Sequence, residues 1–190
     1  VELLAGIPSV IYGLVGILVL NPVMYKLELF LFQNSKTHQF TGGANLISAV
    51  IVLAIMILPT VINISESALK AVPQNLKSAS LALGASHIQT IFKVMIPAAK
   101  SGILAAVVLG IGRAIGETMA VIMVAGNQAR MPQGILKGLR TMTANIVTEM
   151  GYATGMHREA LIATGVVLFV FILIINLSLS LLNRRAENAN

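Results

Sequence analysis

The sequence of 190 residues contains no cysteine and no tryptophan, and few of its side chains carry a charge. Without cysteine the chain forms no disulfide and offers no thiolate to a metal ion. Only 11% of the residues are charged, whereas about a quarter are charged in soluble domains. This shortage argues against a soluble globular protein and favours residence in a membrane.

The motifs of common enzymes are missing as well. No G-x-x-x-x-G-K-[ST] phosphate loop occurs, so we expect that this chain does not itself hydrolyse a nucleotide. No set of Ser, His and Asp has a spacing that supports nucleophilic catalysis. His38, His87 and His157 are each isolated from a second ligand at metal spacing. We therefore expect a chain that is not an enzyme and holds no metal and no cofactor of its own.

Hydrophobic residues make up 56% of the chain, and the mean hydropathy is +0.87. The net charge of +6 would suggest a nucleic-acid partner in a soluble protein. Here the cations are dispersed along the chain, which is typical of the flanks of membrane helices. We therefore expect membrane lipids, and no nucleic acid, around this chain.

Four stretches are long and apolar enough to cross a bilayer. A hydrocarbon core of about 30 Å needs about 20 mostly apolar residues in a helix, and the stretches that qualify are 3–20, 46–64, 98–125 and 160–182. These stretches predict an all-α, polytopic transmembrane helical bundle. Asn21-Pro22 is expected to end the first helix, Pro59 to kink the second and Arg184-Arg185 to end the last.

A polar segment, residues 73–97, separates the second and third stretches. Gly84 stands between two short amphipathic pieces, and Ser86 with Gln89 three residues later gives a capping-box pattern for the second piece. Just before the segment, Glu66 and Lys70 are spaced four apart on a predicted extension of the second helix. By periodicity alone, the polar segment could equally be an ordinary linker.

The third stretch carries Arg113 and Glu117 near its middle. Residues four apart share a helix face, and charges inside a membrane face a bundle interior or a water-filled path. Arginine presents a fork of donors that matches oxyanions such as phosphate. The pair therefore indicates a path for a polar solute, with a purely structural ion pair as the alternative. Gly112 and Gly116 fit a helix-packing pattern of small residues.

The connection from 127 to 158 is too long for a structureless loop. Residues 135–139 and 141–150 are predicted to form short helices at the membrane face. Glu149 in this connection reads as a solvated loop carboxylate.

The run S-A-S-L-A-L-G-A-S-H-I-Q-T-I-F-K-V-M-I-P at 78–97 resembles the EAA loop of bacterial ABC importer permeases. That pattern is EAA, three residues, Gly, nine residues, Ile, one residue and Leu-Pro. Ala79, Gly84 and Pro97 match it in register. Four positions depart from it: Ser78 and Ser80 stand for Glu and Ala, and Val94 and Ile96 stand for Ile and Leu. Ala85 follows the shared glycine.

Three further stretches resemble the permeases of phosphate-specific transport (Pst) systems. They are E-L-L-A-G-I-P-S-V-I-Y-G at 2–13, G-R-A-I-G-E-T-M-A-V at 112–121, and the run 141–165. The G-E-T-M-A-V ending is more similar to the C subunit than to the A subunit. Such permeases have about six transmembrane helices, so residues 1–190 are expected to be a single permease domain that lacks its N-terminal helices.

The resemblance implies a MetI-like type I fold and the function of a membrane subunit in an ATP-driven phosphate importer. It implies that the polar segment docks on a cytoplasmic ATPase subunit, which would hold ATP and Mg²⁺, and that Arg113 and Glu117 lie on the phosphate path. The other partners would be a second permease subunit, as a heterodimer, and an extracytoplasmic phosphate-binding protein. The location would be the bacterial inner membrane, with a cytoplasmic C-terminus.

Three alternatives stay open on the residues alone. They are an ABC permease for another solute such as sulfate or molybdate, an ion-coupled secondary transporter or channel, and a membrane anchor with a buried ion pair.

Overall fold

The structure is a computed structural model that describes residues 6–33, 39–131 and 134–188, with side chains up to Leu181. Helices form nearly all of its regular structure, and within these ranges it has no strand, only an isolated bridge between Gly126 and Leu139. The α-helices are α2 (Ser9–Val15), α3 (Asn21–Leu31), α4 (Leu46–Lys70), α5 (Gln74–Ala82), α6 (His87–Thr90), α7 (Ile96–Ala98), α8 (Lys100–Gly116), α9 (Met119–Val124), α10 (Met142–Glu149) and α11 (Gly155–Asn188). Two π-helical turns, η1 (Gly16–Leu20) and η2 (Ile91–Met95), interrupt them.

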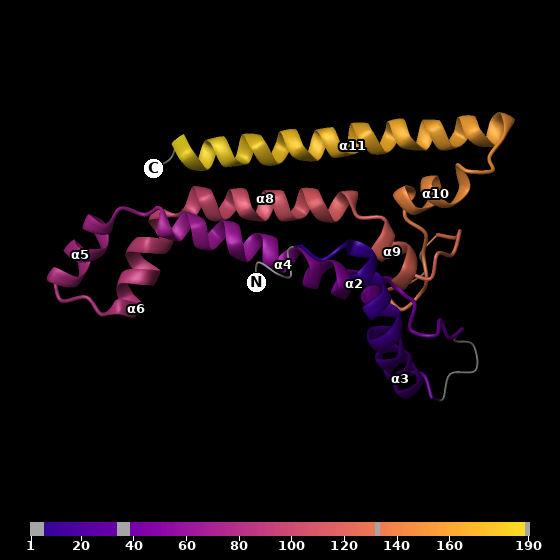
Figure 1. Cartoon of the computed structure of the whole chain (residues 1–190), viewed down its shortest axis with the longest axis horizontal. Helices are drawn as coiled ribbons and strands as arrows, with labels where there is room; N and C mark the ends of the chain where they lie inside the picture. The colour runs from indigo at the N-terminus through magenta and orange to yellow at the C-terminus, as the bar shows by residue number, and fades with distance from the viewer. Residues whose placement is uncertain (1–5, 34–38, 132–133, 189–190) are drawn as a thin grey trace.

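Three long helices, α4, α8 and α11, run side by side through the molecule (Figure 1). The short helices α5 and α6 project from one end of this bundle, where the C-terminus also lies, and α9 and α10 lie at the other end. Among the residues that the structure describes, three helices are long and apolar enough to cross a membrane, and these are Ser9–Leu31, Leu46–Lys70 and Gly155–Leu181. A fourth span results if the bent pair His87–Ala98 and Lys100–Gly116 is taken as one. The chain is therefore an all-α, polytopic bundle, as the sequence predicts.

The first span does not end at Asn21-Pro22, so that prediction is wrong. A π-helical turn, η1, directly precedes Asn21, whose backbone N–H donates to the carbonyl of Gly16, five residues back. Proline lacks an N–H and its ring collides with the carbonyl four residues earlier. The wider turn moves the local hydrogen-bond pattern away from that carbonyl, so the helix passes Pro22 and continues to Leu31. The predicted start at Leu3 lies outside the described residues.

The second span behaves more regularly. α4 begins at Leu46 and is capped by Asn45, whose side chain accepts a hydrogen bond from the backbone of Ser48, and it keeps α-helical structure through Pro59. It extends to Lys70, as the polar residues after the apolar stretch predict. The predicted i,i+4 pair is confirmed, because Lys70 Nζ lies 2.6 Å from Glu66 Oε1.

The third span is shorter than the sequence predicts, and it is broken. The chain bends by 69° at the junction between His87–Ala98 and α8. α8 then ends at Gly116, whereas a continuous helix from 98 to 125 was expected, and α9 follows as a separate helix. Glu117 lies in the break with extended dihedral angles.

The connection and the last span also differ from expectation. The predicted helix at 141–150 is confirmed by α10, whereas residues 135–139 form turns and a bridge. α11 begins at Gly155, before the expected 160, and it passes Arg184-Arg185 to reach Asn188. Arg, Ala and Glu are good helix formers, and no glycine or proline interrupts them there.

Small residues let α8 approach α4 closely. A β-carbon at Gly102 would lie 2.5 Å from Ala68 Cβ, and one at Gly110 would lie 2.6 Å from Val61 Cγ2. Ala106, between these glycines, is fully buried. Its spacing of four from each places all three on one helix face, so α8 packs against α4 through a stripe of small residues. A second cluster, where α4 and α9 meet, contains Ala49, Val52, Ala120, Val121, Val124 and Ala125.

Candidate functional site

Arg113 lies in the last turn of α8, and its side chain is exposed within this chain. Its Nη1 atom donates a hydrogen bond of 3.1 Å to Thr60 Oγ1. Thr60 follows Pro59 in α4, so the bond joins the two helices that the small-residue stripe holds together. A guanidinium has five N–H donors. One hydroxyl orients the group, and the remaining donors are available to an anion.

Glu117 does not share a helix face with Arg113, which corrects the expectation of a pair spaced four apart on one helix. α8 ends one residue before it, and Glu117 Oε1 accepts a hydrogen bond of 3.1 Å from the backbone N–H of Ala120. Thr118 Oγ1 donates to the carbonyl of Gly116 at 3.3 Å. The first N–H groups and last carbonyls of a helix have no partners inside it. These two side chains supply partners on both sides of the break, and therefore stabilise it.

The expected packing role of Gly112 and Gly116 finds little support inside this chain. A β-carbon at Gly112 would lie 3.9 Å from Asn176 Oδ1 of α11, and one at Gly116 would meet nothing within 4 Å in the described residues. The close approach of α8 to α4 occurs through Gly102 and Gly110 instead. A packing role for Gly112 and Gly116 therefore stays a prediction.

The polar segment folds as two short helices joined at Gly84. Its φ is +85°, in the left-handed region that favours glycine. The N–H of Gly84 donates to the carbonyl of Leu81, and that of Ala85 donates to the carbonyl of Ser80. These two bonds form a Schellman motif, which ends α5 and turns the chain. A side chain at 84 would meet nothing within 4 Å, so only the backbone angle requires glycine.

The second half of the polar segment has its own N-terminal cap and a hydrogen bond to the first half. Ser86 and Gln89 form both hydrogen bonds of the predicted capping box, at 3.2 Å and 2.9 Å. The hydroxyls of Ser80 and Thr90 lie 3.0 Å apart, and Thr90 is 1% exposed. Because Ser80 is on α5 and Thr90 on α6, this bond fixes the angle between the two pieces.

The structure places the other predicted residues of the polar segment as follows. Ser78 on α5 donates its hydroxyl to the carbonyls of Gln74 and Asn75, within its own helix. The remaining residues are Ala79 and Pro97, which are exposed, and Ala85, Val94 and Ile96, which are half-buried.

Large apolar side chains of the polar segment point away from the rest of the chain. Leu83 is 90% exposed, Ile88 is 70% exposed and Phe92 is 67% exposed. These three residues surround the Gly84 turn and the helix after it. Exposed apolar groups on an otherwise polar projection are typical of a surface that contacts another protein.

A polar cluster lies at the opposite end of the bundle. Arg140 Nη1 lies 2.6 Å from Glu149 Oε1, and both side chains are 19% exposed. Arg140 also donates to Asn127 Oδ1 at 2.8 Å and to Asn145 Oδ1 at 3.2 Å. The expectation that Glu149 is a solvated loop carboxylate is therefore wrong, because it neutralises a partly buried arginine.

Two more side chains contact Glu149. The hydroxyl of Tyr152 donates a hydrogen bond to the carboxylate, and this bond, followed by the one from Arg140, lowers the pKa of Glu149 below its ordinary 4.5. His157 Nε2 lies 3.3 Å from Glu149 Oε2. The same contact with Glu149 raises the pKa of Tyr152 above 10.0. The cluster joins α10 to the start of α11.

Sequence reasoning missed three residues of these sites: Thr60, Thr90 and Arg140. Each has its partner on a different helix or loop, and no local pattern marks it. Thr60 and Thr90 stand in segments with an apolar face, and a hydroxyl buried on such a face needs a hydrogen-bond partner. Their hydroxyls were therefore the signal from which these two residues could have been found.

Comparison with known proteins gives consistent relatives over nearly the whole chain. The chain is 42% identical over 181 residues to the probable ABC transporter permease protein YqgH of Bacillus subtilis, covering 92% of this chain and 55% of that protein. It is 37% identical over 201 residues to the phosphate transport system permease protein PstC of Xylella fastidiosa, covering 99% and 62%. It is 35% identical over 187 residues to PstC 2 of Mycobacterium tuberculosis, covering 93% and 57%.

The chain thus spans between 55% and 62% of the lengths of these relatives. No solved structure matches it. A family model, described as the binding-protein-dependent transport system inner membrane component, matches residues 1–188. With a match of that extent, and with apolar helices long enough to cross a membrane, the chain belongs to the family of binding-protein-dependent transport system inner membrane components.

Proposed function

We propose that this chain forms the translocation part of the permease subunit of an ATP-driven phosphate importer. The observation that carries the proposal is a continuous connection between two features. The polar segment, with its exposed apolar surface, leads through the 69° bend directly into α8, whose last turn holds Arg113. Movement of the polar segment would therefore reach the arginine through one helix.

The polar segment is the contact for a cytoplasmic ATPase subunit, which holds ATP and Mg²⁺. Leu83, Ile88 and Phe92 supply the apolar contact, and the Ser80–Thr90 bond makes the two short helices move as one body. On this proposal the polar segment is cytoplasmic, and the C-terminus is cytoplasmic with it; their position at the same end of the bundle supports this orientation (Figure 1). The polar cluster at the other end then faces outside, toward an extracytoplasmic phosphate-binding protein.

Arg113 is the anion-binding residue of the path. Its guanidinium is held by Thr60, and its free donors match the oxygens of a tetrahedral oxyanion. Glu117 holds the break after α8 in place and so fixes where the arginine-bearing turn ends. Relatives named as phosphate transport permeases support phosphate over other oxyanions. A second permease subunit, as a heterodimer, completes the path across the bacterial inner membrane.

Uptake of radiolabelled phosphate by cells that carry the complete transporter tests this function. Arg113→Ala is expected to lower uptake by at least about tenfold, because the hydrogen bonds of a charged donor are lost. Arg130→Ala is the matched control, since Arg130 is exposed in the loop after α9. Both variants should reach the membrane in equal amounts.

Three results would contradict the proposal. Unchanged uptake in Arg113→Ala removes the arginine from the path. Uptake that competes with sulfate or molybdate better than with phosphate indicates a permease for another oxyanion. Transport that persists without a nucleotide-binding subunit indicates a secondary transporter or channel.

A further inference from the structure

Helix α4 presents three different faces over its second half. Toward α8 it packs Val61 and Ala68 against the two glycines of the small-residue stripe. A second face is apolar and exposed within this chain, and its residues, spaced three and four apart, are Ile55, Leu58 and Ile62. The third face carries polar side chains at the same spacing, and these are Thr60, Asn63 and Ser67. This third face is called the polar face of α4 below.

The polar face continues the side of α4 that forms the core in the first half of the helix. There the buried residues at the same spacing are Ala49, Val52 and Met56. The first two of these pack with α9 in the second cluster. The series 49, 52, 56, 60, 63 and 67 advances by three or four residues at each step, so it follows one side of the helix. The side of α4 that turns inward at α9 therefore becomes polar on its way to the polar segment.

Polar groups on this face need partners, because α4 is apolar enough to cross a membrane. Ser67 satisfies its hydroxyl within the helix, by donating to the carbonyl of Asn63 at 2.9 Å. The carboxamide of Asn63 makes no hydrogen bond within the part of the chain that the structure describes. Hydrocarbon offers such a group neither a donor nor an acceptor, so polar side chains in a membrane face a bundle interior or a water-filled cavity. Lipid is therefore a poor cover for the polar face.

The hydrogen bond of Arg113 indicates what lies against the polar face. Its guanidinium reaches Thr60, the first residue of this face, at 3.1 Å. Asn63 follows three residues later, about 4.5 Å further along the helix axis. A carboxamide has two N–H donors, so an oxyanion that leaves Arg113 toward the polar segment meets new donors at once. We propose that the polar face of α4 lines the solute path between Arg113 and the polar segment, and that Asn63 donates hydrogen bonds to the oxyanion there.

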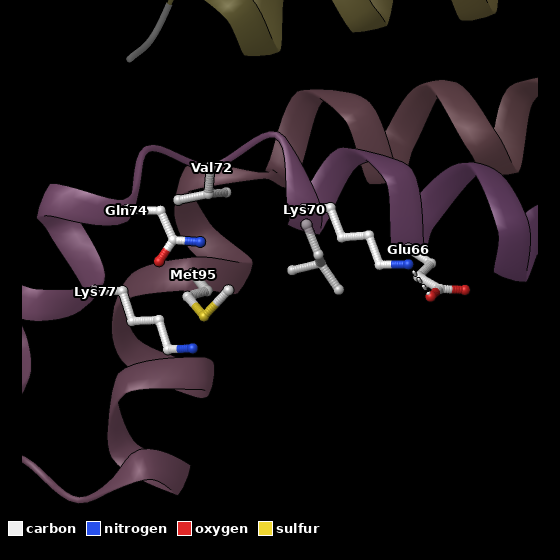
Figure 2. Close-up of a pocket in the computed structure, with 7 residues that line it drawn as sticks. Glu66, Lys70, Val72, Gln74, Lys77 and Met95 are labelled. Carbon is white, nitrogen blue, oxygen red and sulfur yellow. Dashed lines mark ion pairs between the residues drawn. The ribbon is translucent and has the colours of Figure 1, made fainter.

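The end of the polar face is in water. Lys70, three residues after Ser67, continues the same spacing, and it forms an ion pair with Glu66 that Figure 2 shows as a dashed line. Both side chains are more than half exposed. They border a hollow of about 230 Å³ that extends to Lys77 of α5. A solute that passes Asn63 therefore reaches hydrated surface where the polar segment leaves α4. The identity of the solute rests on the proposed function, whereas the hydration of this face does not.

Labelling of single cysteines with a negatively charged, membrane-impermeant thiol reagent tests whether the polar face is wet. The chain contains no cysteine, and the other subunits are used in cysteine-free form. The reactive thiolate forms in water, whereas apolar surroundings raise the pKa of the thiol. In opened membranes, Asn63→Cys and Ser67→Cys are expected to react at least about tenfold faster than two controls on the apolar face. The controls are Leu58→Cys and Ile62→Cys, which are more exposed than residue 63 within this chain.

Two results of the labelling would overturn the proposal. Equal reaction at all four positions would show that the polar face is no different from the apolar face. A lack of reaction at 63 and 67 would show that another subunit, and not the solute path, covers the polar face. Neither result depends on which solute the transporter carries.

Protection from labelling and uptake test the contact with the solute. Phosphate should slow the labelling of Asn63→Cys, and Arg113→Ala should remove this protection. Asn63→Leu keeps nearly the size of asparagine without its donors, and it is expected to lower phosphate uptake about tenfold. Asn63→Gln keeps the donors and should retain most of the uptake.

The outcomes separate this contact from the proposed substrate. Protection by sulfate and not by phosphate would support the contact of residue 63 with an oxyanion and contradict the proposed phosphate importer. Labelling that neither anion slows would overturn the contact, and so would normal uptake by Asn63→Leu.

Discussion

At the residue scale, a hydroxyl on a neighbouring helix orients the candidate anion-binding arginine. The bond from Arg113 to Thr60 joins residues 53 positions apart in the chain. Long arginine side chains have many rotamers, and a fixed acceptor removes part of that freedom before a ligand arrives. We therefore propose that Thr60 is a positioning residue that acts through Arg113.

Replacing Thr60 by valine tests this role. Valine has nearly the shape of threonine but accepts no hydrogen bond, so we expect phosphate uptake to fall about tenfold, as for loss of a bond to a charged group. Thr60→Ser keeps the hydroxyl and should retain most of the uptake. The loss should appear mainly in the phosphate concentration at half-maximal uptake. Equal uptake by the valine and serine variants would show that the hydroxyl has no part in transport.

The Glu149 cluster gives a stability that depends on pH. The pKa of Glu149 is lowered in the folded protein, chiefly by the Tyr152 hydroxyl and then by Arg140. A lowered carboxyl pKa stabilises the folded state above the unfolded value, here 4.5, and this stabilisation disappears as the pH falls through the folded pKa. The raised pKa of Tyr152 has its effect at the alkaline end, where stability is lost as the pH rises above 10.0.

Thermal unfolding of the purified transporter from about pH 3.5 to about pH 8 measures the loss of this stabilisation at acidic pH. We expect Glu149→Gln to unfold at a lower temperature than the unsubstituted protein near neutral pH. The difference should shrink as the pH falls below 4.5, because the carboxylate then takes up its proton. Glu159→Gln, an exposed position in the first turns of α11, is the control. A difference that stays constant with pH would exclude the ionised carboxylate as the cause.

At the element scale, two helices accommodate a proline by widening the turn before it. η1 ends two residues before Pro22, and η2 ends two residues before Pro97. In both cases the helix continues past the proline, although Pro97 is soon followed by the 69° bend at Ala99. The π-turn before Pro97 thus joins the polar segment to α8 without a loop. A short rigid connection of this kind transmits movement better than a flexible one.

The left-handed turn at Gly84 sets the shape of the polar segment. Gly84→Ala is expected to cost about 1–2 kcal/mol, because an L-residue resists the left-handed conformation. Such a cost lowers the ratio of the native turn to its alternative conformations by a factor of roughly 5–30. Phosphate-dependent ATP hydrolysis by the complete transporter should fall accordingly.

Gly151→Ala is the matched control for this change. A β-carbon at Gly151, as at Gly84, would meet nothing within 4 Å, but its φ lies outside the left-handed region. The control should therefore hydrolyse ATP at the normal rate. If the two alanine variants behave alike, the shape of the Gly84 turn is not needed for coupling.

At the scale of the whole molecule, the helices separate two kinds of surface. The polar segment and the C-terminus occupy one end, and α10, the helix that ends at Glu149, occupies the other (Figure 1). Between them, α11 leaves most of its apolar side chains exposed, with only 6% of its most hydrophobic window buried. Lipid or another subunit therefore covers this helix in a membrane.

Labelling of single cysteines tests which end faces the cytoplasm, and the 190 residues contain no cysteine that would interfere. Ser86→Cys marks the polar segment and Thr154→Cys marks the turn before α11, and both positions are exposed. A membrane-impermeant maleimide is expected to label Thr154→Cys in intact cells and Ser86→Cys only after the membrane is opened. The reverse pattern would contradict the proposed orientation.

The sequence by itself determined the features that depend on neighbours in the chain. Hydropathy placed the long apolar helices, because each must bury or satisfy its own backbone in lipid. Capping chemistry placed the Ser86 box, and a left-handed turn explains Gly84. The resemblance in residues 78–97 and 112–121 identified the family, which the match over residues 1–188 confirms.

Only the tertiary structure decided how the charged residues are used. Periodicity assigned Arg113 and Glu117 to one helix face, but the helix ends between them and each finds a different partner, Thr60 and the backbone of Ala120. The hydrogen bond from Arg140 to Asn127 likewise joins residues 13 positions apart, near the two ends of the loop between α9 and α10. The physical reason is that hydropathy and spacing report local preference, whereas the partner of a polar group is set by where the packed helices bring it.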